Sequence, residues 1–359
     1  MQTNGLHHVT AVAGDPQANL DFYTGTLGLR FVKRTVNFDD TTTYHLYYGD
    51  ETGSPGTAFT FFPFAGARPG RPGRGQAVAT AFAVPDGSLD YWSERLAASP
   101  ATVGDRLTRF GAGVLPFEDP DGQPLELVET DPDDLPIEPW TGGPVPDDRA
   151  IRGFFGVTLH SAKPEATANV LDILGFDRVG SEDDGGERVR YVAAGDHATV
   201  VDVLHRHPPR GRPGVGTVHH VAFRAEDETE QLQWRDRLSE AGQFVTPQKD
   251  RQYFQSIYFR EPGGILFEIA TDGPGFTVDE DVDALGSALK LPEWLADERE
   301  GIEAALPSLD PPESGVDADP GTDAPDGEAA ASASDTVASD EESATAASAT
   351  TALNGGKNR

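Results

Sequence analysis

The chain has 359 residues and a formal net charge of −32, from 60 acidic and 28 basic side chains. Such a charge repels phosphate backbones, so we expect no nucleic-acid partner. The sequence contains no cysteine, which excludes disulfides, thiolate metal sites and cysteine nucleophiles. No apolar run reaches the length of a membrane span and no export signal precedes the first predicted strand, so we expect a cytoplasmic protein without membrane contact.

Acidic residues are spread along the chain, whereas lysine is scarce. Five of the 28 basic residues are lysines, namely Lys33, Lys163, Lys249, Lys290 and Lys357. Dispersed acid with little lysine is typical of proteins from salt-loving organisms, where screening makes a highly charged surface tolerable. We therefore expect a halophilic source, which bears on solubility and not on chemistry.

The first predicted elements are a strand, a helix and a further strand. Residues 5–10 (GLHHVT) have the composition of a strand and carry two adjacent histidines. Asp15 followed by Pro16 predicts the start of a helix, because aspartate caps helix N-termini and proline suits the first helical position. We expect this helix to end near residue 28, and residues 29–32 (LRFV) to resume as a strand.

The same order of elements returns in the second half of the chain. Residues 163–175 (KPEATANVLDILG) predict a helix at an offset of 147 from the first one. Residues 118–127 (EDPDGQPLEL) align with residues 260–269 (REPGGILFEI) at an offset of 142. In both copies a turn rich in proline or glycine leads into the last strand. We therefore expect each copy to contain a strand, a helix and three strands, written βαβββ.

The repeat predicts an α+β fold of two paired βαβββ modules, at residues 1–130 and 151–275. Residues 131–150, rich in proline, aspartate and glycine, are expected to link them. Residues 276–306 predict a helical extension. Residues 307–359 are rich in alanine, serine, aspartate and glycine and cannot bury enough apolar surface to fold, so we expect a disordered acidic tail.

Four motifs resemble the vicinal oxygen chelate superfamily of glyoxalases, bleomycin resistance proteins and extradiol dioxygenases. They are residues 6–10 (LHHVT), 22–28 (FYTGTLG), 219–223 (HHVAF) and 262–268 (PGGILFE). Residues 44–50 (YHLYYGD) and 250–264 (DRQYFQSIYFREPGG) are similar to ring-cleaving dioxygenases of the hydroquinone-degrading type. The resemblance covers residues 4–306, and it implies two βαβββ modules paired around a metal.

Two paired copies could build two equivalent metal sites, each with one ligand from a first strand and two from the other copy. One combination is His8, His220 and Glu268, and the other is Gly156, Ala79 and Glu126. Two histidines and one carboxylate suit a ferrous or similar divalent ion and leave positions open for substrate and O₂. We therefore expect the first site to bind the metal and the second to be vestigial, with its glutamate at the surface.

A site built from the second copy alone would need a ligand at Gly156, which has no side chain. His160 lies four residues farther along the same predicted strand, about 13 Å away. This distance is too great for His160 to replace the missing ligand, so the site shared by both copies is favoured.

Each histidine pair requires a choice of ligand, and the alternation of side chains along a strand supplies it. His219 shares its predicted face with apolar residues and suits packing under the helices, whereas His220 lies on the opposite face. We therefore predict His8 and His220 as ligands. His7 and His219 are predicted to be structural.

Three further side chains are candidates for the acid or base of the reaction. Tyr253 and Tyr258 lie on or near the strand before Glu268, where either could contact a substrate oxygen or simply pack. The resemblance favours Tyr253. His45 lies among tyrosines and has an unperturbed pKa near neutrality. We predict Tyr253 and His45 as catalytic residues, in that order.

The resemblance implies Fe(II)-dependent cleavage of a catechol or hydroquinone-like ring with O₂, with Mn(II) or another divalent ion as the alternative metal. The competing hypotheses are a glyoxalase- or epimerase-like reaction, fosfomycin modification and a non-catalytic ligand-binding module. Isomerase chemistry at a fully occupied octahedral metal commonly needs two carboxylate ligands. The repeat supplies only a single carboxylate, which favours iron and oxygen. One chain carries both copies, so we expect a monomer or a homodimer.

Overall fold

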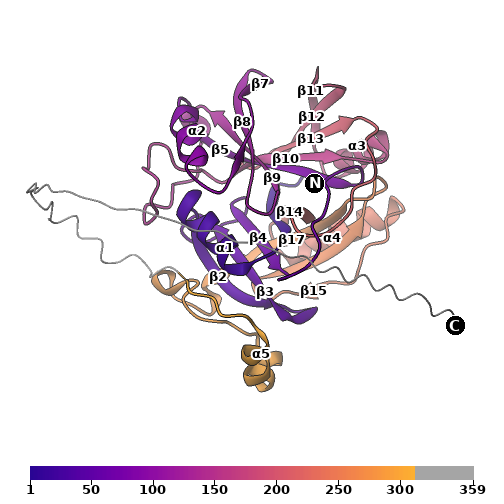
Figure 1. Ribbon diagram of the computed structural model, residues 1–359. Coiled ribbons are helices and arrows are strands. Elements are labelled where there is room, and N and C mark those ends of the chain that lie inside the picture. The colour runs from indigo at the N-terminus through magenta and orange to yellow at the C-terminus, as the bar shows by residue number, and fades with distance from the viewer. Residues whose placement is uncertain (312–359) are drawn as a thin grey trace, which may run out of the picture. The chain divides into compact units, whose positions relative to one another are not determined.

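The computed structural model of the chain describes residues 1–311, and Figure 1 shows their arrangement. The described strands form an eight-stranded sheet and a nine-stranded sheet. The predicted acidic tail lies outside the described residues from position 312 onward. Within residues 1–311, no helix is both long and apolar enough to span a bilayer.

The first sheet joins the beginning of the chain to its later part, in the order β15-β16-β17-β14-β1-β4-β3-β2. Its strands are β1 (Leu6–Ala13), β2 (Arg30–Asn37), β3 (Asp40–Gly49), β4 (Ala58–Pro63), β14 (Thr217–Ala225), β15 (Lys249–Asp250), β16 (Phe254–Arg260) and β17 (Leu266–Pro274). The antiparallel pairing of β1 with β14 joins the two copies in this sheet.

The second sheet contains the middle of the chain, in the order β11-β12-β13-β10-β5-β9-β8-β6, with β7 beside β8. Its strands are β5 (Gln76–Pro85), β6 (Thr102–Val103), β7 (Leu107–Arg109), β8 (Ala112–Glu118), β9 (Pro124–Thr130), β10 (Phe154–His160), β11 (Asp177–Asp183), β12 (Glu187–Val192) and β13 (Val200–His205). Here the antiparallel pair that joins the copies is β5 with β10.

Helices follow the strands β1, β5, β10 and β14. They are α1 (Pro16–Asp21) with the π-helical turn η1 (Phe22–Thr26), α2 (Leu89–Ala97), α3 (Pro164–Ile173) and α4 (Glu228–Glu240). The predicted start of the first helix is confirmed, since the Asp15 side chain accepts a hydrogen bond from the Ala18 backbone N–H and Pro16 is the first helical residue. Short helices occupy other parts of the described chain: η2 (Pro132–Asp134), η3 (Phe276–Val278), η4 (Val282–Ala284), η5 (Glu293–Glu298) and α5 (Arg299–Ala305).

The predicted α+β fold with two repeats is confirmed, but each repeat contains the βαβββ unit twice. The first unit, β1 to β4, pairs with the fourth, β14 to β17, and the second pairs with the third. The prediction of one unit per repeat passed over α2 and α4. Each of these helices is buried around a tryptophan, Trp92 in α2 and Trp234 in α4.

The main core contains residues from both sheets. The ring of Phe59 on β4 lies 5.9 Å from that of Phe82 on β5 and 6.1 Å from that of Phe154 on β10. Trp92 of α2 and Trp234 of α4 are fully buried in the same core. This packing leaves the ladder of β1, β14 and β17 as a fixed frame on which side chains can be placed.

Candidate metal centre

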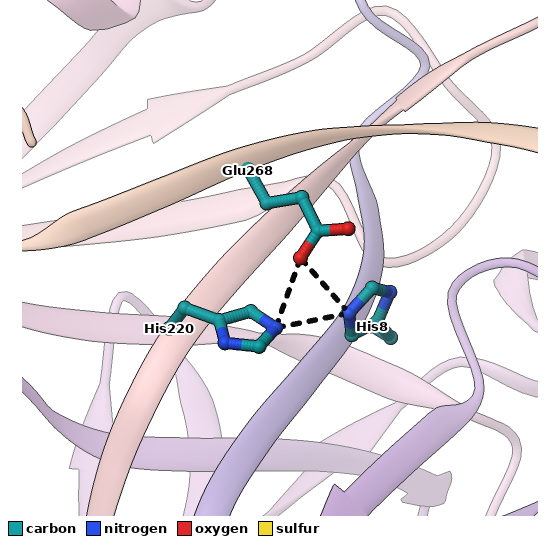
Figure 2. Close-up of side chains that lie close together, drawn as sticks. All are labelled: His8, His220 and Glu268. Carbon is teal, nitrogen blue, oxygen red and sulfur yellow. Dashed lines mark hydrogen bonds and ion pairs between the residues drawn. The ribbon is translucent and has the colours of Figure 1, made fainter. Parts of the chain in front are cut away.

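Three strands of the first sheet bring His8, His220 and Glu268 together, as Figure 2 shows. The Nε2 atoms of the two histidines are 3.1 Å apart. Glu268 Oε2 lies 2.9 Å from His220 Nε2 and 3.4 Å from His8 Nε2. An octahedral ion with bonds of about 2.1 Å has ligand–ligand edges of about 3.0 Å. The three atoms therefore have the spacing of one face of such an octahedron.

The sheet register explains why these residues meet. On β1 and β14, His8 is paired with Ala222 and Thr10 with His220. On the parallel strands β14 and β17, Ala222 is paired with Glu268. The two ligands on β1 and β17 thus flank one position of β14, and His220 lies two residues away on the same face.

The donor atoms fit a divalent metal. All three side chains are buried, and Oε2 of Glu268 has no hydrogen-bond partner among the described residues, whereas its Oε1 accepts one from Ser256. Burial alone would raise the pKa of Glu268, but the facing imidazoles outweigh it and hold that pKa well below its usual range. An ionised carboxylate beside two imidazoles suits Fe(II), Mn(II) or a similar ion.

His7 fixes the tautomer of the ligand beside it. Its Nε2 lies 3.0 Å from the carbonyl oxygen of Thr271, which can only accept, so Nε2 carries the proton. Burial, reinforced by His8, lowers the pKa of His7 to about 3, so the ring is neutral and Nδ1 must accept. His8 Nδ1, 2.9 Å away, therefore donates to it, and His8 Nε2 keeps its lone pair for a metal.

The predicted position of His219 is wrong, because β14 is not regular at this point. Thr10 pairs with His220 and Ala11 with Val218, so His219 is the extra residue of a β-bulge. A bulge re-aims its side chain, and His219 is exposed and lines the cavity next to the centre. Its Nδ1 lies 2.8 Å from Nδ1 of His220.

A cavity of about 300 Å³ opens beside the centre. Aromatic and apolar side chains form much of its wall: Phe38, Phe62, Phe64, Phe254 and Leu266. Polar groups gather with the two histidine ligands, among them His45, Tyr47, Arg251 and Tyr258. A largely apolar cavity with a few convergent polar groups is the usual form of a site for a small molecule.

His45 lines this cavity, as a catalytic role would require. Its Nε2 lies 2.8 Å from Thr60 Oγ1, and its Nδ1 lies 2.7 Å from the hydroxyl of Tyr47. Burial, followed by the charges of His8 and His220, lowers the pKa of His45 well below its ordinary value. The imidazole is therefore neutral near pH 7, which suits a proton acceptor better than a donor.

Tyr253 does not line the cavity, contrary to the prediction. Its ring is buried behind the cavity wall, where it packs against Tyr47 and Phe276, and its hydroxyl donates to Asp279 at 3.1 Å. Gln252 before it has φ 68°, a left-handed turn that re-aims the chain as it enters β16. The tyrosine at the cavity is Tyr258.

Tyr258 could have been selected from the sequence by counting the register through the hairpin. Arg260 pairs with Leu266 across the turn, so Tyr258 pairs with Glu268 and points to the same face. Arg251 donates from Nε to the Tyr258 hydroxyl at 3.2 Å. Burial raises the pKa of Tyr258, as does the charge of Glu268, so the hydroxyl remains protonated at neutral pH.

The equivalent positions of the second sheet are Gly156, Ala79 and Glu126, as predicted from the repeat. Gly156 pairs with Ala81, Thr158 with Ala79, and Ala81 with Glu126. A Cβ at Gly156 would lie 2.2 Å from the carbonyl oxygen of Val200, so no side chain fits there. This set of positions, the twin cup, therefore cannot hold the same three ligands.

The twin cup is filled by charged side chains. Glu126, predicted at the surface, is buried and accepts a hydrogen bond from Arg109 at 2.7 Å. Beside it, Asp202 accepts from Arg188 at 3.1 Å and from Arg190 at 2.8 Å. Guanidinium groups thus provide the positive charge in this cup.

Comparison with known proteins agrees with this geometry. Residues 5–127 and 166–269 match the family model of the Glyoxalase/Bleomycin resistance protein/Dioxygenase superfamily. The chain belongs to this superfamily. The resemblance noted in the sequence motifs is thereby confirmed, and its coverage includes His8, His220 and Glu268.

Relatives in the superfamily cover most of the chain. A Bacillus subtilis (strain 168) protein named putative ring-cleaving dioxygenase MhqO is 49% identical over 306 residues, covering 85% of this chain and 96% of the relative. The chlorohydroquinone/hydroquinone 1,2-dioxygenase of Sphingobium indicum is 36% identical over 312 residues, covering 85% of this chain and 95% of the relative.

Solved structures show the same fold. The crystal structure of a putative dioxygenase from Bacillus subtilis is 48% identical, with a TM-score of 0.83 over 87% of this chain and 99% of that one. Glyoxalase I from Zea mays, 16% identical, has a TM-score of 0.56 over 75% of this chain and 92% of that one, and it shares the fold alone.

Proposed function

We propose that this chain is an Fe(II)-dependent dioxygenase that cleaves the ring of a hydroquinone- or catechol-like aromatic diol. The observation that carries the proposal is the buried cluster of His8, His220 and Glu268, whose two histidines line an aromatic-walled cavity. The names of the relatives support it, since one is a hydroquinone 1,2-dioxygenase and another is named a ring-cleaving dioxygenase.

The two histidines and the carboxylate would hold the iron. Bound there, Fe(II) supplies open coordination positions and the electron needed to combine a diol with O₂. All three side chains are buried, Glu268 is ionised and the tautomer of His8 is fixed by His7, so little reorganisation is needed on metal binding. All three come from one chain, so a monomer is sufficient for the centre.

Tyr258 and Arg251 would orient the substrate. Because Tyr258 accepts from Arg251 Nε, its own proton is free to be donated to a substrate oxygen in the cavity. The neutral His45 would take a proton from the second hydroxyl through the Tyr47 hydroxyl, which contacts its Nδ1 and also lines the cavity. The phenylalanine rings of the wall would hold the substrate ring and exclude water from the reacting atoms.

The isomerase hypothesis has no observation in its favour. Among the described residues, the cluster of possible metal ligands contains a single carboxylate. The binding-module hypothesis does not explain why three ligand atoms should be buried at octahedral spacing. The dioxygenase proposal explains both features.

Oxygen uptake by the anaerobically Fe(II)-loaded protein tests the proposal. With a hydroquinone or catechol, the wild type should consume O₂. His220→Ala should lower the rate more than about 100-fold, because even mutation of residues that hydrogen-bond to metal ligands lowers activity or metal affinity by about 10- to 100-fold. His207→Ala, which changes an exposed histidine, is the matched control and should remain active. Turnover of a methylglyoxal–thiol adduct without O₂ consumption would support the isomerase hypothesis instead.

A further inference from the structure

The tip of the β2–β3 hairpin forms one edge of the cavity. Asn37, Phe38 and Asp39 all line it. Phe38 is half-buried and Asp39 is exposed, so this tip is the place where the cavity wall meets solvent. The part of a bound substrate that extends away from the metal ligands would therefore contact Phe38.

The C-terminal extension, residues 276–310, supports the outer side of this hairpin, and Figure 1 shows its helices beside β2 and β3. Trp294 of η5 packs edge-on against Phe38, with ring centroids 5.6 Å apart. Leu295 and Ile302 form a small core with Val36 of β2. The same extension thus contacts the aromatic residue that faces the cavity.

Further contacts anchor the extension along the edge of β2. The Lys290 backbone N–H donates to the carbonyl of Arg34 at 2.9 Å. The fully buried Lys33 ammonium lies 2.6 Å from a carboxylate oxygen of Asp279 and also contacts Glu280. A buried charge paired in this way strongly favours one position of the extension, because separating the partners leaves an uncompensated charge.

The inner side of the hairpin is held by the catalytic wall. Asp39 accepts from Arg251 at 2.8 Å, across the mouth of the cavity. Arg251 in turn donates to Tyr258. The tip is therefore fixed between two supports, the extension outside and Arg251 inside.

We propose that Phe38 is a specificity-determining residue, and that Trp294 is a positioning residue that acts through it. This inference rests on the proposed dioxygenase function. With Trp294 in place, Phe38 limits the size of a ring substituent directed toward the cavity mouth. Without that support Phe38 can move outward, and larger substituents fit. The C-terminal extension thereby takes part in substrate selection although it does not line the cavity.

The test compares Fe(II)-loaded full-length proteins on hydroquinone, methylhydroquinone and tert-butylhydroquinone. Trp294→Ala should raise kcat/KM for tert-butylhydroquinone relative to hydroquinone by about tenfold, the lower end of what a misfit in an apolar pocket produces. The change should appear mainly in KM. Trp294→Phe retains an aromatic contact and should restore the wild-type ratio, and Phe38→Ala should shift it in the same direction as Trp294→Ala.

Val278→Ala is the matched control, because Val278 is an exposed apolar residue of the same extension and does not line the cavity. It should leave the ratio unchanged. An equal change on all three substrates, or none, in both Trp294→Ala and Phe38→Ala would overturn the inference while leaving the dioxygenase function intact. Failure of the wild type to consume O₂ with any of the three would overturn both.

Discussion

At the scale of single residues, the position of each histidine in the β-ladder decides whether it faces the candidate metal centre. His8 and His220 occupy ladder positions and meet Glu268, whereas His7 and His219 are the extra residues of two bulges. A bulge residue can contact its neighbour's ring through Nδ1 while the neighbour keeps Nε2 for the metal. Regular alternation selected the two histidines that meet Glu268, but it could not place His219, because a bulge breaks the period of two.

The two tyrosines of this region give a direct comparison. Tyr258→Phe removes the hydroxyl that lines the cavity and should lower kcat about 100-fold, the typical cost of losing one positioned donor. Tyr253→Phe removes a hydroxyl bound to Asp279 outside the cavity and should change kcat by less than about threefold. Steady-state oxygen uptake measures both. The reverse order of effects would contradict the assignment of Tyr258.

At the scale of the elements, the two sheets show the same frame with different contents. The first sheet carries two histidines and a carboxylate, whereas the twin cup carries an arginine–carboxylate network. The repeat in the sequence predicted the equivalent positions, since ladder register survives divergence. The network itself was not predictable, because Arg109, Arg188 and Arg190 come from strands whose pairing the sequence did not specify.

The twin cup should be structural and should not bind the metal. Glu126→Ala leaves Arg109 buried without its partner and should lower the free energy of unfolding by about 3–5 kcal/mol. Glu118→Ala, on an exposed position of the same sheet, should change it by less than about 0.5 kcal/mol. Denaturant unfolding measures the stability, and the iron content of folded Glu126→Ala should equal that of the wild type. Loss of iron would show that this cup takes part in metal binding.

At the scale of the whole molecule, the first and last units form one sheet, and the metal centre lies on the seam between them. Motif and repeat together were sufficient to predict the fold class and the three side chains that meet in the candidate metal centre. They did not give the number of units, because the helices α2 and α4 were not recognised, and Tyr258 is identified only when the register is counted through the hairpin of β16 and β17. The residues of the cavity wall could not be predicted from the sequence either. Phe38 and Arg251 line the same cavity only because the complete sheet brings their strands together.

The central claim is that this one centre inserts oxygen into an aromatic ring. It is tested most directly by the mass of the product formed from hydroquinone under isotopically labelled O₂ by the Fe(II)-loaded protein. We expect a ring-opened product that contains both atoms of one O₂ molecule, with one O₂ consumed for each substrate. A quinone without label, or an unchanged ring with no O₂ consumed, would contradict it.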